Sequence, residues 1–166
     1  MDLSKPLAYR MMPKTLDDYV GQEHILGENK ILYRTIKADR LSSIILWGPP
    51  GCGKTSLAKV ISNTTKYKFI KLNAVTAGVS DIKNAIIESE NLLMNPSGKC
   101  ILFIDEIHTL IGNDAQGALD LANMFKEGLS RGTIKMIGAT TTYEYERYIM
   151  RDKAFLRRFE KVDVSE

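Results

Sequence analysis

Short apolar segments alternate five times with helix-like segments along this chain of 166 residues. The second, third and fourth apolar segments are nearly continuous in apolar and β-branched residues, which is typical of strands covered on both faces. The segments between them carry apolar residues three or four positions apart, as one face of a helix does. This alternation predicts an α/β fold with a mainly parallel sheet.

Residues 1–27 are expected to form an irregular lead-in to this pattern, because Pro13, Gly21 and Gly27 interrupt it. The expected strands are Ser43–Trp47, Lys68–Asn73, Lys99–Ile104, Lys135–Ala139 and Lys161–Val164. The expected helices are Glu28–Arg40, a segment beginning near Lys54, Val79–Leu93, Ala118–Leu129 and Thr142–Arg151.

Composition narrows the class of protein. With 44% hydrophobic and 26% charged residues, the chain predicts one globular domain over residues 1–166. A net charge of +3 argues against a polybasic nucleic-acid binder. Five lysines lie between Gly51 and Ser80, and we interpret them as a solvated helix face rather than a nucleic-acid surface. No apolar run approaches the roughly 18–20 residues of a membrane helix, and no secretory signal is visible. We therefore expect a cytoplasmic protein without a membrane partner.

The segment Gly48-Pro49-Pro50-Gly51-Cys52-Gly53-Lys54-Thr55 lies between an expected strand and an expected helix and satisfies the pattern GxxxxGK[ST]. Glycines let successive backbone N–H groups point at phosphate oxygens, and the following helix N-terminus adds partial positive charge. Lys54 is expected to reach the β- and γ-phosphates, and the Thr55 hydroxyl to bind Mg²⁺. The alternative is a Gly/Pro-rich turn that happens to hold a lysine. The expected nucleotide-binding residues of this loop are Pro49, Pro50, Gly51, Cys52, Gly53, Lys54, Thr55 and Ser56.

Two acids, Asp105 and Glu106, follow the expected strand that ends at Ile104. At the carboxyl end of a parallel strand, Asp105 is expected to hold Mg²⁺ through its water shell, and Glu106 to deprotonate an attacking water. The alternative is a helix N-terminus that carries acids. His108, two positions further on, is interpreted as structural.

Polar residues at two other strand ends complete the expected site. Thr141 is predicted to hydrogen-bond the γ-phosphate or the attacking water, with a helix cap in this segment as the alternative. Asn73 is predicted to orient Glu106, with an Asx turn as the alternative. Arg157 and Arg158 have the planar fork that suits phosphate, although their spacing alone favours a solvated basic turn.

The phosphate loop, Asp105-Glu106, the strand end Gly138–Thr141 and Arg157-Arg158, in this order, resemble an AAA+ ATPase over nearly the whole chain. Residues 7–87 resemble the RarA/MgsA (WRNIP-like) family, which acts at stalled replication forks. Residues 101–166 look instead like the first ATPase domain of Clp/Hsp100 protein unfoldases, which leads to the hypothesis of a chimera joined within residues 88–100. The runs that carry the two resemblances are Pro13–His24 and Asn73–Val79 for the first, and Ile104–Gly112 and Arg157–Phe159 for the second.

The resemblance implies a P-loop three-layer sandwich with strand order 5-1-4-3-2. It implies that Val20 and Gly21 line the adenine pocket, that Asn73 is a switch amide on Glu106, and that Thr141 is sensor 1. Arg157 and Arg158 would act on the nucleotide of a neighbouring subunit, which implies self-association into a ring. No helical lid is expected within the chain, so the resemblance implies weak hydrolysis of ATP·Mg²⁺. A nucleotide-binding module, or an engineered chimera without turnover or partner, is the alternative, and DNA and protein remain open as remodelling substrates.

Overall fold

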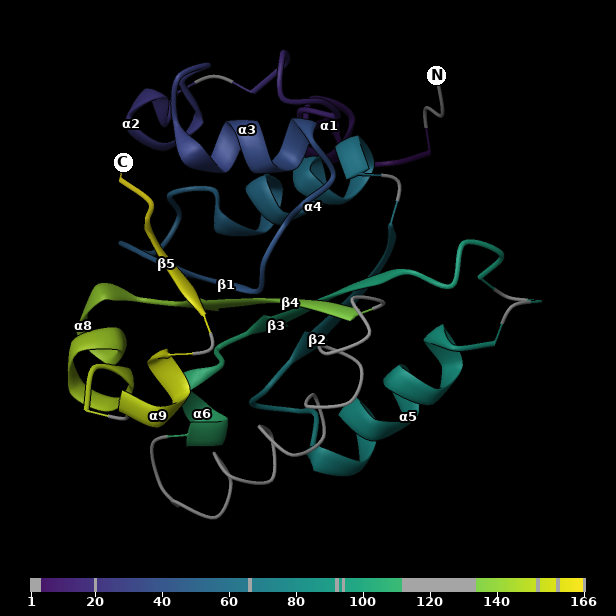
Figure 1. The fold of residues 1–166 in the computed structure, drawn as a ribbon, viewed down its shortest axis with the longest axis vertical. Coiled ribbons are helices and arrows are strands. Elements are labelled where there is room, and N and C mark those ends of the chain that lie inside the picture. Colours follow the sequence, from purple (N-terminus) through teal and green to yellow (C-terminus); the bar gives the residue numbers. More distant parts are fainter. Residues whose placement is uncertain are drawn as a thin grey trace.

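The computed structural model describes residues 4–165 except for 20, 66, 92, 94, 112–133, 152 and 158. Its centre is one parallel sheet with the strand order β2-β3-β4-β1-β5 (Figure 1). This is the order 5-1-4-3-2 expected above, and the α/β fold class is confirmed. Most strand ends lie one residue away from the expected positions, and the others coincide with them. The strands are β1 (Ile44–Trp47), β2 (Lys68–Asn73), β3 (Cys100–Asp105), β4 (Ile134–Thr140) and β5 (Glu160–Asp163).

Helices cover both faces of this sheet. One layer contains α1 (Leu7–Arg10), α2 (Glu23–Leu26), α3 (Ile31–Lys37) and α4 (Lys54–Thr65) (Figure 1). The opposite layer contains α5 (Val79–Ser89), α6 (His108–Ile111), α8 (Thr142–Glu144), the π-helix η1 (Tyr145–Ile149) and α9 (Lys153–Leu156) (Figure 1). None of the helices in the described part of the chain is both long and apolar enough to cross a bilayer.

Alternate residues of the central strands supply two separate cores. On one face, Ile44 and Phe103 join side chains of α3 and α4, and on the other, Ile45 and Leu102 join side chains of α5 and η1. Every residue of β3 before Asp105 is buried, as a strand covered on both faces requires. The buried strands hold their carboxyl ends, where the polar residues lie, in fixed positions relative to one another.

Four expectations need correction. The lead-in contains the one-turn helices α1 and α2 and packs on the core through Leu16. The helix expected from residue 28 begins at Ile31 and ends at Lys37, because a turn runs from Gly27 to Lys30 and Asp39 has a left-handed backbone (φ 55°).

The helix expected to reach Leu93 ends at Ser89, and the Asn91 side chain then accepts the Leu93 N–H in a local turn (3.0 Å). The segment 142–151 forms α8 followed by η1 rather than one α-helix. The helix expected at Ala118–Leu129 lies outside the described residues.

Candidate active site

A cavity of about 360 Å³ lies where the phosphate loop meets the carboxyl ends of β3 and β4. It brings together residues of three motifs that lie up to about ninety positions apart in the sequence. Its lining residues are Pro50, Gly51, Gly53, Lys54, Thr55, Ser56, Asp105, Glu106, Thr140 and Thr141. The loop therefore shares one cavity with Asp105, Glu106 and Thr141, whereas the expected site residues Asn73 and Pro49 are not among its lining residues.

The phosphate loop owes its shape to its glycines. Gly51 and Gly53 have positive φ values of 77° and 87°, which side chains disfavour. Gly48 is needed for a different reason: a Cβ there would lie 2.0 Å from the backbone oxygen of Val164, which follows β5. The loop is therefore curled as the motif predicts and is fixed against the end of β5.

Lys54 begins helix α4, so its backbone N–H belongs to the helix N-terminus that faces the cavity. Its Nζ donates hydrogen bonds to the carbonyl oxygens of Gly48 (3.0 Å) and Pro49 (2.8 Å) and lies 3.5 Å from Cys52 Sγ. The ammonium group is thus already held over the loop that the motif assigns to phosphate.

A second cavity of about 700 Å³ adjoins the first and shares Pro50, Gly51, Gly53 and Ser56 with it. Its remaining lining residues are Met11, Pro13, Asp18, Tyr19, Gly21, Gln22 and Cys52. Gly21 thus lies in a cavity next to the loop, while Val20 lies outside the described residues.

Tyr19 was not singled out from the sequence. Its hydroxyl donates to the Gly53 carbonyl (3.3 Å), and burial raises the pKa of this phenol above its usual 10.0. Tyr19 lies within the run Asp18-Tyr19-Val20-Gly21, of which the family resemblance assigned only Val20 and Gly21 to the adenine pocket.

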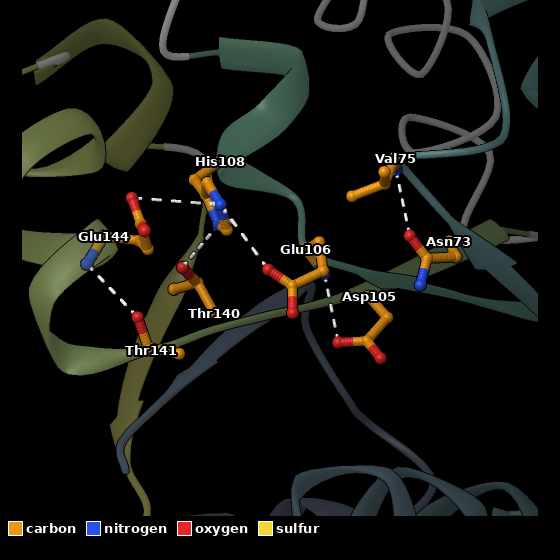
Figure 2. A network of polar contacts seen from close by, with 8 residues as sticks. All are labelled: Asn73, Val75, Asp105, Glu106, His108, Thr140, Thr141 and Glu144. Atoms are coloured by element: carbon orange, nitrogen blue, oxygen red, sulfur yellow. Dashed lines mark hydrogen bonds and ion pairs between the residues drawn. The ribbon is translucent and has the colours of Figure 1, made fainter. Parts of the chain in front are cut away.

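The two acids differ in their backbone. Asp105 ends β3 opposite Asn73 of β2, and its Oδ1 accepts the N–H of Glu106 (3.0 Å) (Figure 2). Glu106 has φ 56°, one of three positive values at non-glycine residues in the described part of the chain. Such a conformation costs roughly 1–2 kcal/mol.

The donor set fits Mg²⁺ bound with a nucleotide. The Asp105 carboxylate and the Thr55 hydroxyl line the same cavity, and both are oxygen donors of the kind Mg²⁺ prefers. Among the described residues no group of three or more His, Cys, Asp or Glu side chains could hold a metal ion.

Glu106 lies beside a polar network centred on His108 (Figure 2). His108 Nε2 lies 3.4 Å from Glu106 Oε2 and 3.9 Å from Glu144 Oε2, and Nδ1 lies 3.0 Å from Thr140 Oγ1. The sequence interpretation of His108 as merely structural overlooked this network, along with Thr140 and Glu144. Little in the sequence indicates this network, because His108 and Thr140 are 32 positions apart.

Asn73 and Thr141 both make the local contacts that were named as alternatives. Asn73 Oδ1 accepts the Val75 N–H (2.9 Å) in an Asx turn, and Thr141 Oγ1 accepts the Glu144 N–H (3.3 Å) as the N-cap of α8 (Figure 2). Thr141 nevertheless lines the cavity, so a cap and a nucleotide contact are compatible.

Of the two arginines the structure describes Arg157, which lines neither cavity. Arg157 lies on an exposed turn after α9, and Arg158 lies outside the described residues. Their action on a neighbouring subunit therefore stays a prediction.

The sequence model of the ATPase family associated with various cellular activities (AAA) matches residues 44–164, which include the loop, the acids and all five strands. The chain belongs to this AAA family. The AAA domain is 42% identical to replication-associated recombination protein A of Coxiella burnetii over 136 residues, and 44% identical to the protein of that name from Escherichia coli K12 over 137 residues. Each match covers 82% of this chain and 29% of the relative. The chain thus spans about three tenths of the length of these relatives.

Two further similarities agree with this assignment. ATPase WRNIP1 of Dictyostelium discoideum is 40% identical over 136 residues, or 82% of this chain and 15% of the relative. The solved RuvB Holliday junction branch migration motor of Thermotoga maritima has a TM-score of 0.63 and 26% identity, covering 94% of this chain and 48% of that one.

These matches give no support to a fusion of two families. A match of 136 residues in a chain of 166 leaves at most 30 residues uncovered, so it must cross residues 88–100. The AAA domain therefore resembles single proteins on both sides of the supposed junction, and the chimera hypothesis is set aside.

Proposed function

We propose that this AAA domain binds ATP·Mg²⁺ and hydrolyses it to ADP and phosphate. The observation that carries the proposal is the single cavity lined by the phosphate loop, Asp105, Glu106 and Thr141. It offers hydrogen-bond donors to phosphate, two oxygen ligands for a metal and a carboxylate base within one space. Hydrolysis of a nucleoside triphosphate requires this combination of groups.

Each side chain has a defined task in this reaction. The loop N–H groups and Lys54 bind the β- and γ-phosphates, and Thr55 and Asp105 hold Mg²⁺, which supplies charge neutralisation to the phosphates. Glu106 orients a water and takes its proton as the water oxygen bonds to the γ-phosphorus. The bond from that phosphorus to the β–γ bridging oxygen breaks, and ADP carries the bridging oxygen away. Thr141 hydrogen-bonds the γ-phosphate or the water.

Charge stabilisation by arginine is the part that a neighbouring copy would supply. Within the described part of the chain, no arginine lines either cavity. We therefore propose that Arg157 and Arg158 serve the nucleotide of an adjacent subunit in a ring. The same observation favours the second candidate function, a module that binds nucleotide with negligible turnover when it is alone.

Phosphate release by the wild type and by Glu106→Gln separates these two functions. We expect the amide to lower the rate about 10²-fold or more, the usual range for loss of a positioned general base, while nucleotide affinity is retained. Equal rates in the two proteins would exclude hydrolysis by this site and leave the binding module.

The remodelling partner we propose is DNA. The relatives named replication-associated recombination protein A are similar along most of this chain, although the chain spans only about three tenths of their length. We expect forked DNA, and not an unfolded polypeptide such as casein, to stimulate phosphate release. Stimulation by the polypeptide alone would contradict the proposal.

A further inference from the structure

The backbone around Glu106 is fixed to the end of β3, to α6 and to β4. The Glu106 N–H donates to Asp105 Oδ1, its carbonyl accepts the Thr109 N–H (3.0 Å), and the next N–H, of Ile107, donates to the Ala139 carbonyl of β4 (3.1 Å). The strained φ of 56° is therefore held in place. Because the backbone cannot move freely, the position of the carboxylate depends on what its side chain contacts.

The carboxylate of Glu106 contacts the His108 ring. Nε2 of His108 lies 3.4 Å from Glu106 Oε2, and only 13% of the histidine side chain is exposed. The ring is itself held from two sides, by Thr140 Oγ1 at 3.0 Å from Nδ1 and by the stacked ring of Tyr148 at 6.2 Å between centroids. A side chain held in this way offers its N–H from a fixed point.

The neighbours of the His108 ring favour the tautomer that carries its proton on Nε2. Both carboxylates, Glu106 and Glu144, lie on the Nε2 side of the ring and can only accept (Figure 2). The Thr140 hydroxyl can donate, so it satisfies Nδ1 as an acceptor in the neutral ring. In this tautomer the Nε2–H lies on the side of the two carboxylates, and Glu106 Oε2 is the nearer of them at 3.4 Å.

We infer that His108 is the positioning residue for the Glu106 carboxylate, a role that the resemblance assigned to Asn73. The Asn73 oxygen is engaged with the Val75 N–H, whereas the histidine reaches Glu106 directly. The inference rests on the proposed hydrolysis, in which Glu106 is the base.

Two amide substitutions test it, because each keeps the hydrogen-bonding position of one ring nitrogen. The amide nitrogen in His108→Gln reaches to about the position of Nε2 and can still donate to Glu106. The shorter amide in His108→Asn reaches only to about Nδ1, so it keeps the Thr140 contact and loses Glu106. We expect His108→Asn and His108→Ala to lower kcat for phosphate release about 10- to 100-fold, a part of what a positioned base contributes. His108→Gln should stay within about threefold of the wild type.

A change in positioning should leave binding intact, which a general loss of structure would not. The apparent Kd for ATP, followed through the fluorescence of the single tryptophan, Trp47, is expected to change less than about twofold in all three variants. His24→Asn is the matched control, because this other histidine bonds the Asp163 carbonyl of β5 and lies outside the cavity. It should release phosphate at the wild-type rate.

Three outcomes would overturn the inference. They are equal losses in His108→Gln and His108→Asn, no loss in any His108 variant, or a loss of kcat in Asn73→Ala without one in His108→Asn. Glu106→Gln tells these apart from failure of the proposed function. If Glu106→Gln is slow and the His108 variants are normal, only the positioning role fails. If Glu106→Gln matches the wild type, hydrolysis by this site fails and the positioning role fails with it.

Discussion

At the scale of single residues, the two cysteines illustrate how the fold sets chemical behaviour. Cys52 lies half-buried in the phosphate loop, whereas Cys100 is the buried first residue of β3. Burial raises the pKa of the Cys100 thiol from 9.0 to about 11. The thiol is therefore kept protonated in the folded chain at pH values where it ionises in the unfolded one.

This pKa shift predicts a loss of stability in alkali. As pH rises from about 9 to 11, the unfolded thiol ionises and the folded one does not, so the free energy of unfolding should fall by something on the order of 2 kcal/mol. Urea unfolding across this pH range measures the slope. Cys100→Ala should lose this component of the slope, and Cys52→Ala should keep it. An identical pH dependence in Cys100→Ala and the wild type would contradict the prediction.

At the scale of elements, the close approach of β4 to the residues after β3 fixes the site. A Cβ on Gly138 would lie 2.6 Å from Cδ1 and 3.2 Å from Cγ2 of Ile107, which is fully buried and follows Glu106 directly. A larger residue at this point of β4 would therefore displace the segment that carries the proposed base.

We expect Gly138→Ala to destabilise the domain by about 1–3 kcal/mol, as overpacking of a core does, and to slow phosphate release as well. Urea unfolding measures the loss of stability. Adding Ile107→Val should restore part of the loss, because it shortens the side chain that clashes, and the two changes should not be additive. Gly78→Ser is the control, since a Cβ there meets only Asp81 Oδ2 at 4.0 Å and serine is a favoured N-cap.

The elements also show why part of this structure could be predicted from the sequence. Strands covered on both faces leave continuous apolar runs, so β3 and β4 were recognisable, and a run such as Gly48–Thr55 between a strand and a helix needs no distant information. The end of α5 was not recognisable, because the apolar spacing continues to Leu93, whereas the helix ends at Ser89 and is followed by a turn in which Asn91 accepts the Leu93 N–H. The π-helical turn of η1 left no signal that we could separate from an α-helix.

The polar network was harder to predict for a related reason. Whether Asn73 bonds the backbone two residues on or a carboxylate on the next strand depends on side-chain torsions, and its sequence neighbours are the same in both cases. His108 contacts Thr140 across 32 positions, and only the register of β3 against β4 brings them together. Sequence patterns identified the strand ends but not which side chains there bond to each other.

At the scale of the whole molecule, one ring reports on both the loop and the opposite helical layer. Trp47 immediately precedes Gly48 of the phosphate loop and stacks on Tyr145 of η1, with 4.6 Å between ring centroids and 5° between planes. A ligand that orders the loop, and unfolding of the domain, should therefore both change its fluorescence.

Nucleotide binding should stabilise the whole domain. At an ATP concentration of about 100 times Kd, with Mg²⁺ present, we expect about 2.7 kcal/mol of added stability, measured by urea unfolding followed at Trp47. Lys54→Ala should lose most of this gain. Lys59→Ala should keep it, because that lysine belongs to the same helix but lies over the Phe69 ring, 4.7 Å from its centroid. An equal gain in both lysine variants would argue against a phosphate site at this loop.

The left-handed backbone at Glu106 has a consequence for attempts to improve this protein. Asparagine and glycine tolerate such a backbone better than glutamate does, so replacements here remove strain that the neighbouring strands now hold in place. A directed evolution screen that scores only heat resistance would therefore favour losing this carboxylate, and with it the proposed base. Selection at this position has to include turnover, because thermal robustness and catalysis make opposite demands on it.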